Sequence, residues 1–143
     1  MLNFIISGVE IKSFFVNIGL MLLRIFAGLS ISLAHGINKI PVSDGFIGAT
    51  RELGFPFPAG FAWAAGISEF GCGLLLAAGL VTRPSAFFLS ATMFVAAFIR
   101  HADDPFGTKE KALLYLSIFV FFLLSGSGKF GTDHLLRNKK RLH

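Results

Sequence analysis

The segment from Ala59 to Val81 carries a single charged residue, Glu69, within a run of apolar and small residues. About 20 such residues suffice for a helix to cross the hydrocarbon core of a bilayer. A carboxylate inside a membrane span is energetically expensive unless it is paired, hydrated or protonated. This segment therefore predicts a transmembrane helix, and it makes Glu69 the first candidate functional residue.

The composition of the whole chain is that of an integral membrane protein. Of its 143 residues, 54% are hydrophobic and only 15% are charged, whereas about 25% are charged in an ordinary soluble domain. The length is that of one domain. We therefore expect a single membrane domain, residues 1–143, and no large soluble catalytic domain.

Four apolar segments follow one another along the chain. Each is expected to be a helix, because lipid offers no hydrogen-bond partners for backbone N–H and C=O groups. They cover residues 16–35, 59–81, 84–99 and 112–126, and the last two are near the lower length limit for crossing. In the first loop, Ser43 or Asp44 can cap a short helix that runs to Leu53 on the membrane surface. The predicted fold class is all-α, an integral membrane bundle of four transmembrane helices with a short interfacial helix.

Basic residues set the expected orientation. The N-terminus, second loop and C-terminus carry seven Lys/Arg, against five in the first and third loops, and cytoplasmic segments carry the excess. We expect a bacterial-type cytoplasmic (inner) membrane with both termini in the cytoplasm. The basic tail, residues 129–143, is expected to contact anionic membrane lipids. This placement disfavours nucleic acid as a partner, despite the net charge of +5.

Candidate site residues share faces of the predicted helices. Arg24 and His35 lie on one face of the first span, about three turns apart. Glu69 lies on a face of small residues, which favours close packing against other helices. At about 1.5 Å of rise per residue, Arg24 and Glu69 come to similar depths. We therefore expect Arg24 to reach Glu69, with His35 and His101 nearer the outer surface.

Two interpretations of this polar group are open. Glu69 can be functional, because ionisable groups inside membranes are functional candidates. Alternatively, the Glu69–Arg24 pair only joins two helices, and the histidines are interfacial. No paired ligand spacing supports a metal site. Cys72 is the single cysteine, so the chain cannot form a dithiol centre, and we expect a small buried side chain.

Several short motifs follow one another along the four predicted spans. They are Leu23-Arg24-Ile25, His35-Gly36 with Lys39, Glu69-Phe70-Gly71 through Leu74-Leu75-Leu76, Gly79-Leu80-Val81-Thr82-Arg83, His101, Gly126-x-Gly128 and Asp133. In their order and spacing these motifs resemble the DoxX family, and the likeness covers about residues 16 to 136.

This resemblance implies a four-helix membrane protein that is a small subunit or partner of a quinone-linked membrane oxidoreductase. Glu69 would exchange protons, Arg24 would hold its charge, and His35, His101 and Lys39 would contact a quinone. The sequence carries no ligand set for haem, copper or an iron–sulfur centre. A redox partner protein and a homo-oligomer are both compatible with this interpretation. The alternative is a non-catalytic membrane scaffold, or a carrier of a small solute or lipid, in which the Glu–Arg pair is structural.

Overall fold

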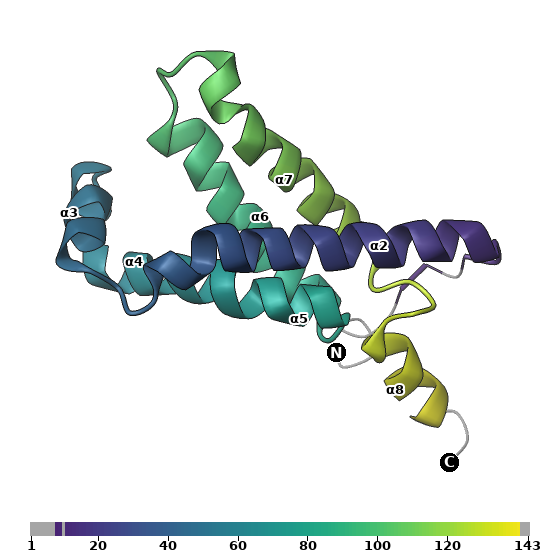
Figure 1. Ribbon diagram of the computed structural model, residues 1–143. Coiled ribbons are helices and arrows are strands. Elements are labelled where there is room, and N and C mark those ends of the chain that lie inside the picture. Colours follow the sequence, from purple (N-terminus) through teal and green to yellow (C-terminus); the bar gives the residue numbers. More distant parts are fainter. Residues whose placement is uncertain (1–7, 10, 141–143) are drawn as a thin grey trace.

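The computed structural model describes residues 8–9 and 11–140, and the regular elements among them are helices (Figure 1). Residues 141–143 of the expected basic tail lie outside the described residues. Three of the long helices contain a short π-helical segment. In chain order the elements are α2 (Phe14–Ile31) with π-helical Ser32–Gly36 and a 3-10 turn Ile37–Lys39, α3 (Asp44–Glu52), α4 (Pro58–Ile67) with π-helical Ser68–Cys72, α5 (Gly73–Ala78), α6 (Thr82–Val95) with π-helical Ala96–Arg100, α7 (Phe106–Ser125) and α8 (Thr132–Lys140).

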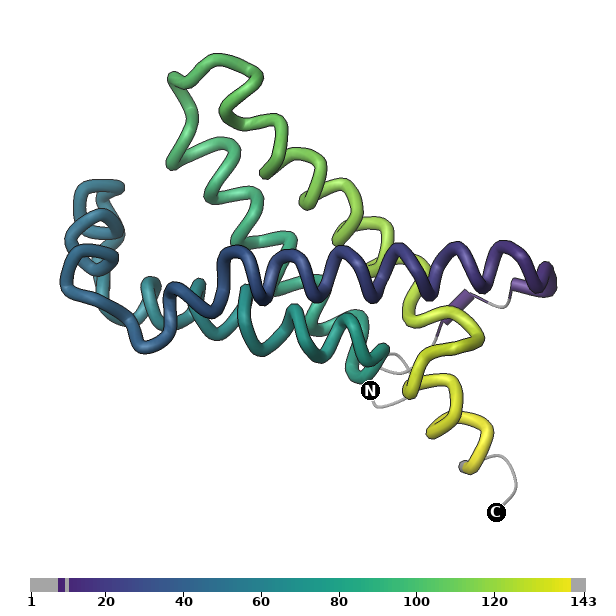
Figure 2. The backbone as a smooth tube through the Cα atoms, viewed as in Figure 1, coloured from purple at the N-terminus to yellow at the C-terminus, as the bar shows by residue number. Residues whose placement is uncertain are grey.

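The helices form two antiparallel pairs that cross one another (Figure 1). One pair is α2 with the continuous rod α4–α5, and the other is α6 with α7. The short helix α3 lies beyond the end of α2 that leads into the first loop, and α8 lies toward the opposite end (Figure 2). The two short helices α3 and α8 therefore lie toward opposite ends of α2.

Small residues allow α2 and the α4–α5 rod to touch through their backbones. A Cβ atom on Gly28 would lie 2.6 Å from the carbonyl oxygen of Gly73 and 2.7 Å from the amide nitrogen of Ala77. A Cβ on Gly36 would lie 2.6 Å from Cα of Phe70. The expected small-residue face of the second span therefore does pack against another helix, as is common in membranes.

The interior is apolar and shared between both pairs, and the outer surface is apolar as well. Four exposed phenylalanines lie on α6 and the π-helical segment that follows it, which suits a surface covered by lipid rather than by water. They are Phe87, Phe88, Phe94 and Phe98. The buried core residues are Leu20, Ala27, Ile31, Leu76, Ala86, Leu89, Met93, Phe119 and Phe122.

Three helices are long and apolar enough to cross a membrane: Phe14–Lys39, Pro58–Ala78 and Thr82–Arg100. These correspond to the first three predicted spans. The fourth predicted span lies in α7, which is 20 residues long. Its first turns carry Lys109, Glu110 and Lys111, so the uncharged part is only the segment from Ala112 onward. The described structure thus has three helices that meet the requirements for a span.

Two predicted boundaries are wrong. The first span continues past His35 to Lys39, because π-helical and 3-10 turns extend α2. The second span is predicted to reach residue 81 and the third to begin at residue 84, but α5 ends at Ala78. Gly79–Val81 form the turn, and Thr82 already begins α6. Gly79 has a φ of 71°, which glycine adopts readily at the end of a helix.

The short helix of the first loop is confirmed. It runs over Asp44–Glu52, and Ser43 Oγ accepts a hydrogen bond from the amide of Phe46 at 3.2 Å. This is the side-chain cap that serine supplies at a helix N-terminus. The helix is followed by Gly54, whose φ is 81°.

Candidate functional site: a buried lysine–glutamate pair

A π-helical segment occurs in each of the three membrane-length helices: Ser32–Gly36, Ser68–Cys72 and Ala96–Arg100. The first two touch, since Gly36 lies against the backbone of Phe70. Ser32 Oγ donates a hydrogen bond to the carbonyl oxygen of Phe70 at 2.8 Å, across the two helices. Such π-helical turns are rare and are frequent at functional sites. Two of the three segments thus meet beside Glu69.

Glu69 is held by Lys39. Lys39 Nζ donates to Oε1 at 2.6 Å and to Oε2 at 2.7 Å. The glutamate side chain is 2% exposed and the lysine side chain 31% exposed. The ammonium also lies 5.3 Å from the ring centroid of Phe46 in α3, within the range of a cation–π contact. The pair therefore joins the first span, the second span and the short helix of the first loop.

Gly66 allows the backbone of Lys39 to pack closely against the second span. A Cβ on Gly66 would lie 3.2 Å from the carbonyl oxygen of Lys39, so the backbone after α2 rests on the helix turn before Glu69. On the other side, Thr92 Oγ1 of α6 lies 3.1 Å from Ser68 Oγ. The residues beside Glu69 thus contact the end of the first span and α6, and the long lysine side chain connects the buried carboxylate to the exterior.

The predicted pair between Glu69 and Arg24 is wrong. Arg24 is buried, and its Nη2 donates to the carbonyl oxygen of Phe130 at 3.3 Å. Its guanidinium lies against Gly79 and Gly131, and the carboxylate of Asp133 attracts it electrostatically.

The reason is the axial register of the helices. Gly28 packs on Gly73, so Glu69 lies level with Gly36. Arg24 precedes Gly36 by 12 residues, which is about 18 Å along a helix. The predicted depths assumed that the start of the first span and the end of the second span lie at the same level.

Asp133 organises the end of the bundle where Arg24 lies. Its Oδ1 accepts from the amide of Val81 at 2.8 Å, and its Oδ2 accepts from the amide of Thr82 at 2.9 Å. Its own amide donates to the carbonyl oxygen of Gly79 at 2.8 Å. Asp133 therefore caps α6 and ties α8 to the α5–α6 turn. Only the family resemblance drew attention to this residue, because no local pattern reveals a cap supplied from so far along the chain.

The two candidate histidines have partners of their own. The ring of His35 meets Tyr115 edge to face at 6.2 Å between centroids, and Tyr115 stacks on Phe119 at 5.6 Å. His101 Nδ1 lies 2.6 Å from Oδ2 of Asp104, and both side chains are partly exposed. Glu69 is therefore bound by Lys39 rather than by a histidine.

Cys72 is half-buried and has a free thiol. Within residues 8–9 and 11–140, no three His, Cys, Asp or Glu side chains lie together as a metal site requires.

The chemistry available at this site is that of a buried acid and an amine in direct contact. A carboxylate and an ammonium can hold a proton between them, and the partly exposed amine can exchange it with water. In a low-dielectric surrounding the charge pair is also strongly attractive. The same geometry is therefore compatible with two roles. The pair can exchange protons with the exterior, or it can hold the first and second spans together.

Membrane-length helices that pack through glycines around a buried charge pair define a multi-pass α-helical membrane protein. More specifically, the chain belongs to the DoxX family, whose model matches residues 19–102. The matched region includes both Lys39 and Glu69 and ends before α7.

Two similar proteins from Haemophilus influenzae (strain ATCC 51907 / DSM 11121 / KW20 / Rd) are both described as uncharacterized. The first is 34% identical over 112 residues, covering 71% of this chain and 79% of that protein. The second is 27% identical over 129 residues, covering 85% of each. No solved structure matches the chain.

Proposed function

We propose that this protein is a small membrane subunit of a quinone-linked oxidoreductase, in which the Lys39–Glu69 pair exchanges protons with a bound quinone. The observation that carries this proposal is the contrast in exposure within the pair, 2% for Glu69 and 31% for Lys39. Reduction of a quinone takes up protons together with electrons. A buried carboxylate bonded to an amine that reaches the exterior is suited to deliver them.

In this proposal a redox partner protein supplies the electrons, and the chain holds the quinone and its protons. His35, half-buried beside Tyr115, is the candidate hydrogen-bond partner for a quinone oxygen. His101 is engaged with Asp104 at the start of the third loop and would act at the entrance. Arg24 belongs to the other end of the bundle, and we assign it no role at the quinone.

The proposed membrane arrangement has four spans, with α7 as the fourth. α7 packs along α6 as its antiparallel neighbour. If α6 crosses the bilayer, α7 therefore lies within the bilayer as well. Lys109 and Lys111 would then lie at the head-group level, where long basic side chains reach water. With an even number of spans, the start of α2 and helix α8 lie on one side. We place that side in the cytoplasm of an inner membrane because its loops carry more Lys and Arg.

A second candidate function is a non-catalytic scaffold, or a carrier of a small solute or lipid. It is favoured by the complete pairing of Glu69, since both carboxylate oxygens already accept from Lys39. A charge pair so well satisfied can simply hold two helices and α3 together.

Quinone extraction from the purified protein distinguishes these functions. We expect quinone to co-purify with the wild type and with Glu110→Gln, a control at an exposed glutamate of α7. We expect it to be lost from Glu69→Gln and from Lys39→Gln. A wild type without quinone, with Glu69→Gln lowering only the thermal stability, would favour the scaffold and contradict the proposal.

A further inference from the structure

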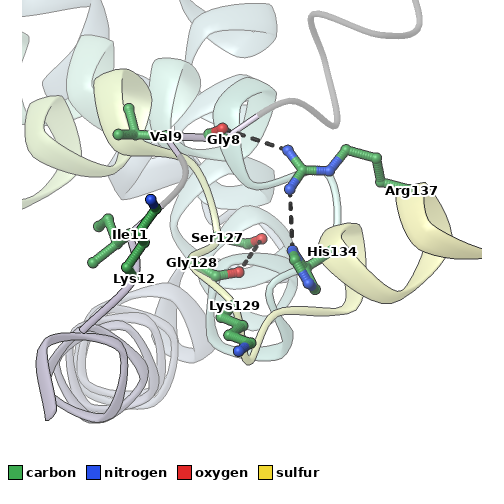
Figure 3. Close-up of a pocket in the computed structure, with 9 residues that line it drawn as sticks. All are labelled: Gly8, Val9, Ile11, Lys12, Ser127, Gly128, Lys129, His134 and Arg137. Carbon is green, nitrogen blue, oxygen red and sulfur yellow. Dashed lines mark hydrogen bonds between the residues drawn. The ribbon is translucent and has the colours of Figure 1, made fainter. Parts of the chain in front are cut away.

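A cavity of about 210 Å³ lies where the segment before α2 meets the segment after α7 and helix α8 (Figure 3). It is at the opposite end of α2 from Lys39 and Glu69. Its polar lining comes from Lys12, Ser127, Lys129, His134 and Arg137. The quinone proposal does not involve this cavity.

The lining is strongly positive. Lys12, Lys129 and Arg137 contribute three cations, and among the described residues that line the cavity there is no carboxylate. Like charges that surround one cavity repel each other, and a bound anion removes that repulsion. Arginine and lysine together are typical ligands of a phosphate group, because they supply several N–H donors and no acceptor.

Arg137 is held in place by its neighbours (Figure 3). Its Nη2 donates to Nδ1 of His134 at 3.2 Å, and its Nη1 donates to the carbonyl oxygen of Gly8 at 3.4 Å. An arginine can only donate, so Nδ1 of His134 accepts. The guanidinium is thereby oriented at the cavity wall before any ligand arrives.

A further positive charge lies behind this wall. A Cβ on Gly131 would be 2.5 Å from Ser127 Oγ and 2.6 Å from Nη1 of Arg24, so both groups adjoin the same glycine. Arg24 is 2% exposed, and its Nε and Nη1 have no hydrogen-bond partner among the described residues. Although Asp133 offsets part of this charge, the buried guanidinium adds to the positive potential at Ser127.

The surroundings of the cavity are apolar. Val9 lines it and is 57% exposed, and Phe14 and Phe15 at the start of α2 are exposed as well. On α8, Leu135 and Leu136 are exposed beside the basic residues Arg137 and Lys139. Exposed apolar side chains beside basic ones are typical of helices that lie in the head-group region of a membrane.

We propose that this cavity binds a phosphate group, carried by the head group of an anionic membrane phospholipid. The three cations would contact the phosphate, and the apolar residues around the cavity would contact the acyl chains. The Ser127 hydroxyl lines the cavity but donates to the carbonyl oxygen of Gly128 at 3.2 Å. The lipid would thereby bridge the start of α2 to α8.

Native mass spectrometry of the purified protein with added phosphatidylglycerol tests this proposal. The cavity variant is Lys129→Gln/Arg137→Gln. The matched control, Lys111→Gln/Lys139→Gln, removes the same charge from exposed positions outside the cavity. We expect the wild type and the control to retain the lipid, and the cavity variant to bind it about tenfold more weakly, the scale of one charge-assisted hydrogen bond. Phosphatidylcholine has the same phosphate but also a choline cation, which the three cations of the cavity would repel, so the wild type should bind it more weakly than phosphatidylglycerol.

Inorganic phosphate distinguishes the two sources of the phosphate group. If it alone raises the thermal stability of the wild type saturably and displaces phosphatidylglycerol, the phosphate site is supported but its occupant is the soluble ion. Equal loss of phosphatidylglycerol from the cavity variant and the control would overturn the proposal, because it would show general charge attraction. Should the double variant fail to fold, the single variant Lys12→Gln provides the same comparison against Lys139→Gln.

Discussion

At the scale of single residues, the two members of the central ion pair lie in different surroundings. Glu69 is almost fully buried, whereas the ammonium of Lys39 is partly exposed beside Phe46. A lysine left alone can turn outward, because its long stem allows the charged end to reach water. A glutamate left alone cannot do so. The pair is therefore asymmetric, and removal of either partner should have a different consequence.

We expect Lys39→Met to lower the stability more than Glu69→Gln does. The first change leaves a buried carboxylate unpaired, at a cost of about 3–5 kcal/mol. The second leaves an ammonium that can become hydrated, and it should cost about 1–2 kcal/mol. The double variant Lys39→Met/Glu69→Gln should lose less than the sum. Thermal unfolding in detergent measures all three, and additive losses would contradict a direct pair.

Asp133 is the second residue whose role can be tested singly. Replacing it with Ala would leave the buried amides of Val81 and Thr82 without an acceptor and Arg24 without its counter-charge. We expect a loss of about 2–4 kcal/mol, since a cap alone contributes about 1 kcal/mol and a buried charge more. Asp103→Ala, at an exposed position, is the control. A similar melting temperature for both variants would argue against the cap.

At the scale of elements, the contact between α2 and the α4–α5 rod decides which residues meet. The two helices approach so closely at Gly28 and Gly36 that their backbones touch. This contact sets the register that brings Lys39, rather than Arg24, to Glu69. The π-helical segments then accommodate the crowding near Glu69, and Ser32 satisfies the carbonyl of Phe70.

Two glycines of the same helix offer a matched test of this contact. Gly28→Ala should destabilise the protein by about 1–3 kcal/mol, because the new methyl group meets the backbone of α5. Gly19→Ala has open space around it, and it should be neutral or stabilising by up to about 1 kcal/mol, since alanine favours a helix. Melting temperatures in detergent compare the two. Equal effects would show that α2 and α5 are not in close contact in solution.

At the scale of the whole molecule, the position of α7 determines the topology. The third loop, with Asp103, lies between α6 and α7, and α8 follows α7. If α7 crosses the bilayer, Asp103 and Lys139 lie on opposite sides of the membrane. If it does not, they lie on the same side.

Labelling of single cysteines with an impermeant maleimide in intact cells measures this. In a Cys72→Ser background, we expect Asp103→Cys to react with the reagent and Lys139→Cys to react only after lysis. Reaction of both in intact cells would indicate three spans and contradict the proposed position of the C-terminus.

Much of the helical framework is predictable from local patterns. The long apolar segments around Glu69 and the capped helix after Ser43 correspond to elements of the structure, and the small-residue face of the second span is buried as expected. The site is less predictable, because a helical period gives the angular position of a residue but not its height relative to another helix. The Arg24 prediction failed for this reason. The cap by Asp133 depends on a chain segment that returns from far along the sequence, and no local signal indicates it.

Patterns within the chain are thus enough to predict an α-helical membrane protein of the DoxX family, with Glu69 turned toward the other helices. The tertiary structure alone decided that Lys39 is its partner, that Arg24 lies with Asp133 at the other end, and that three cations line one cavity. The physical reason is that apolar periodicity is a property of one helix, whereas register is set where glycines of two helices come into contact. Residues from distant parts of the chain meet only after that contact has formed.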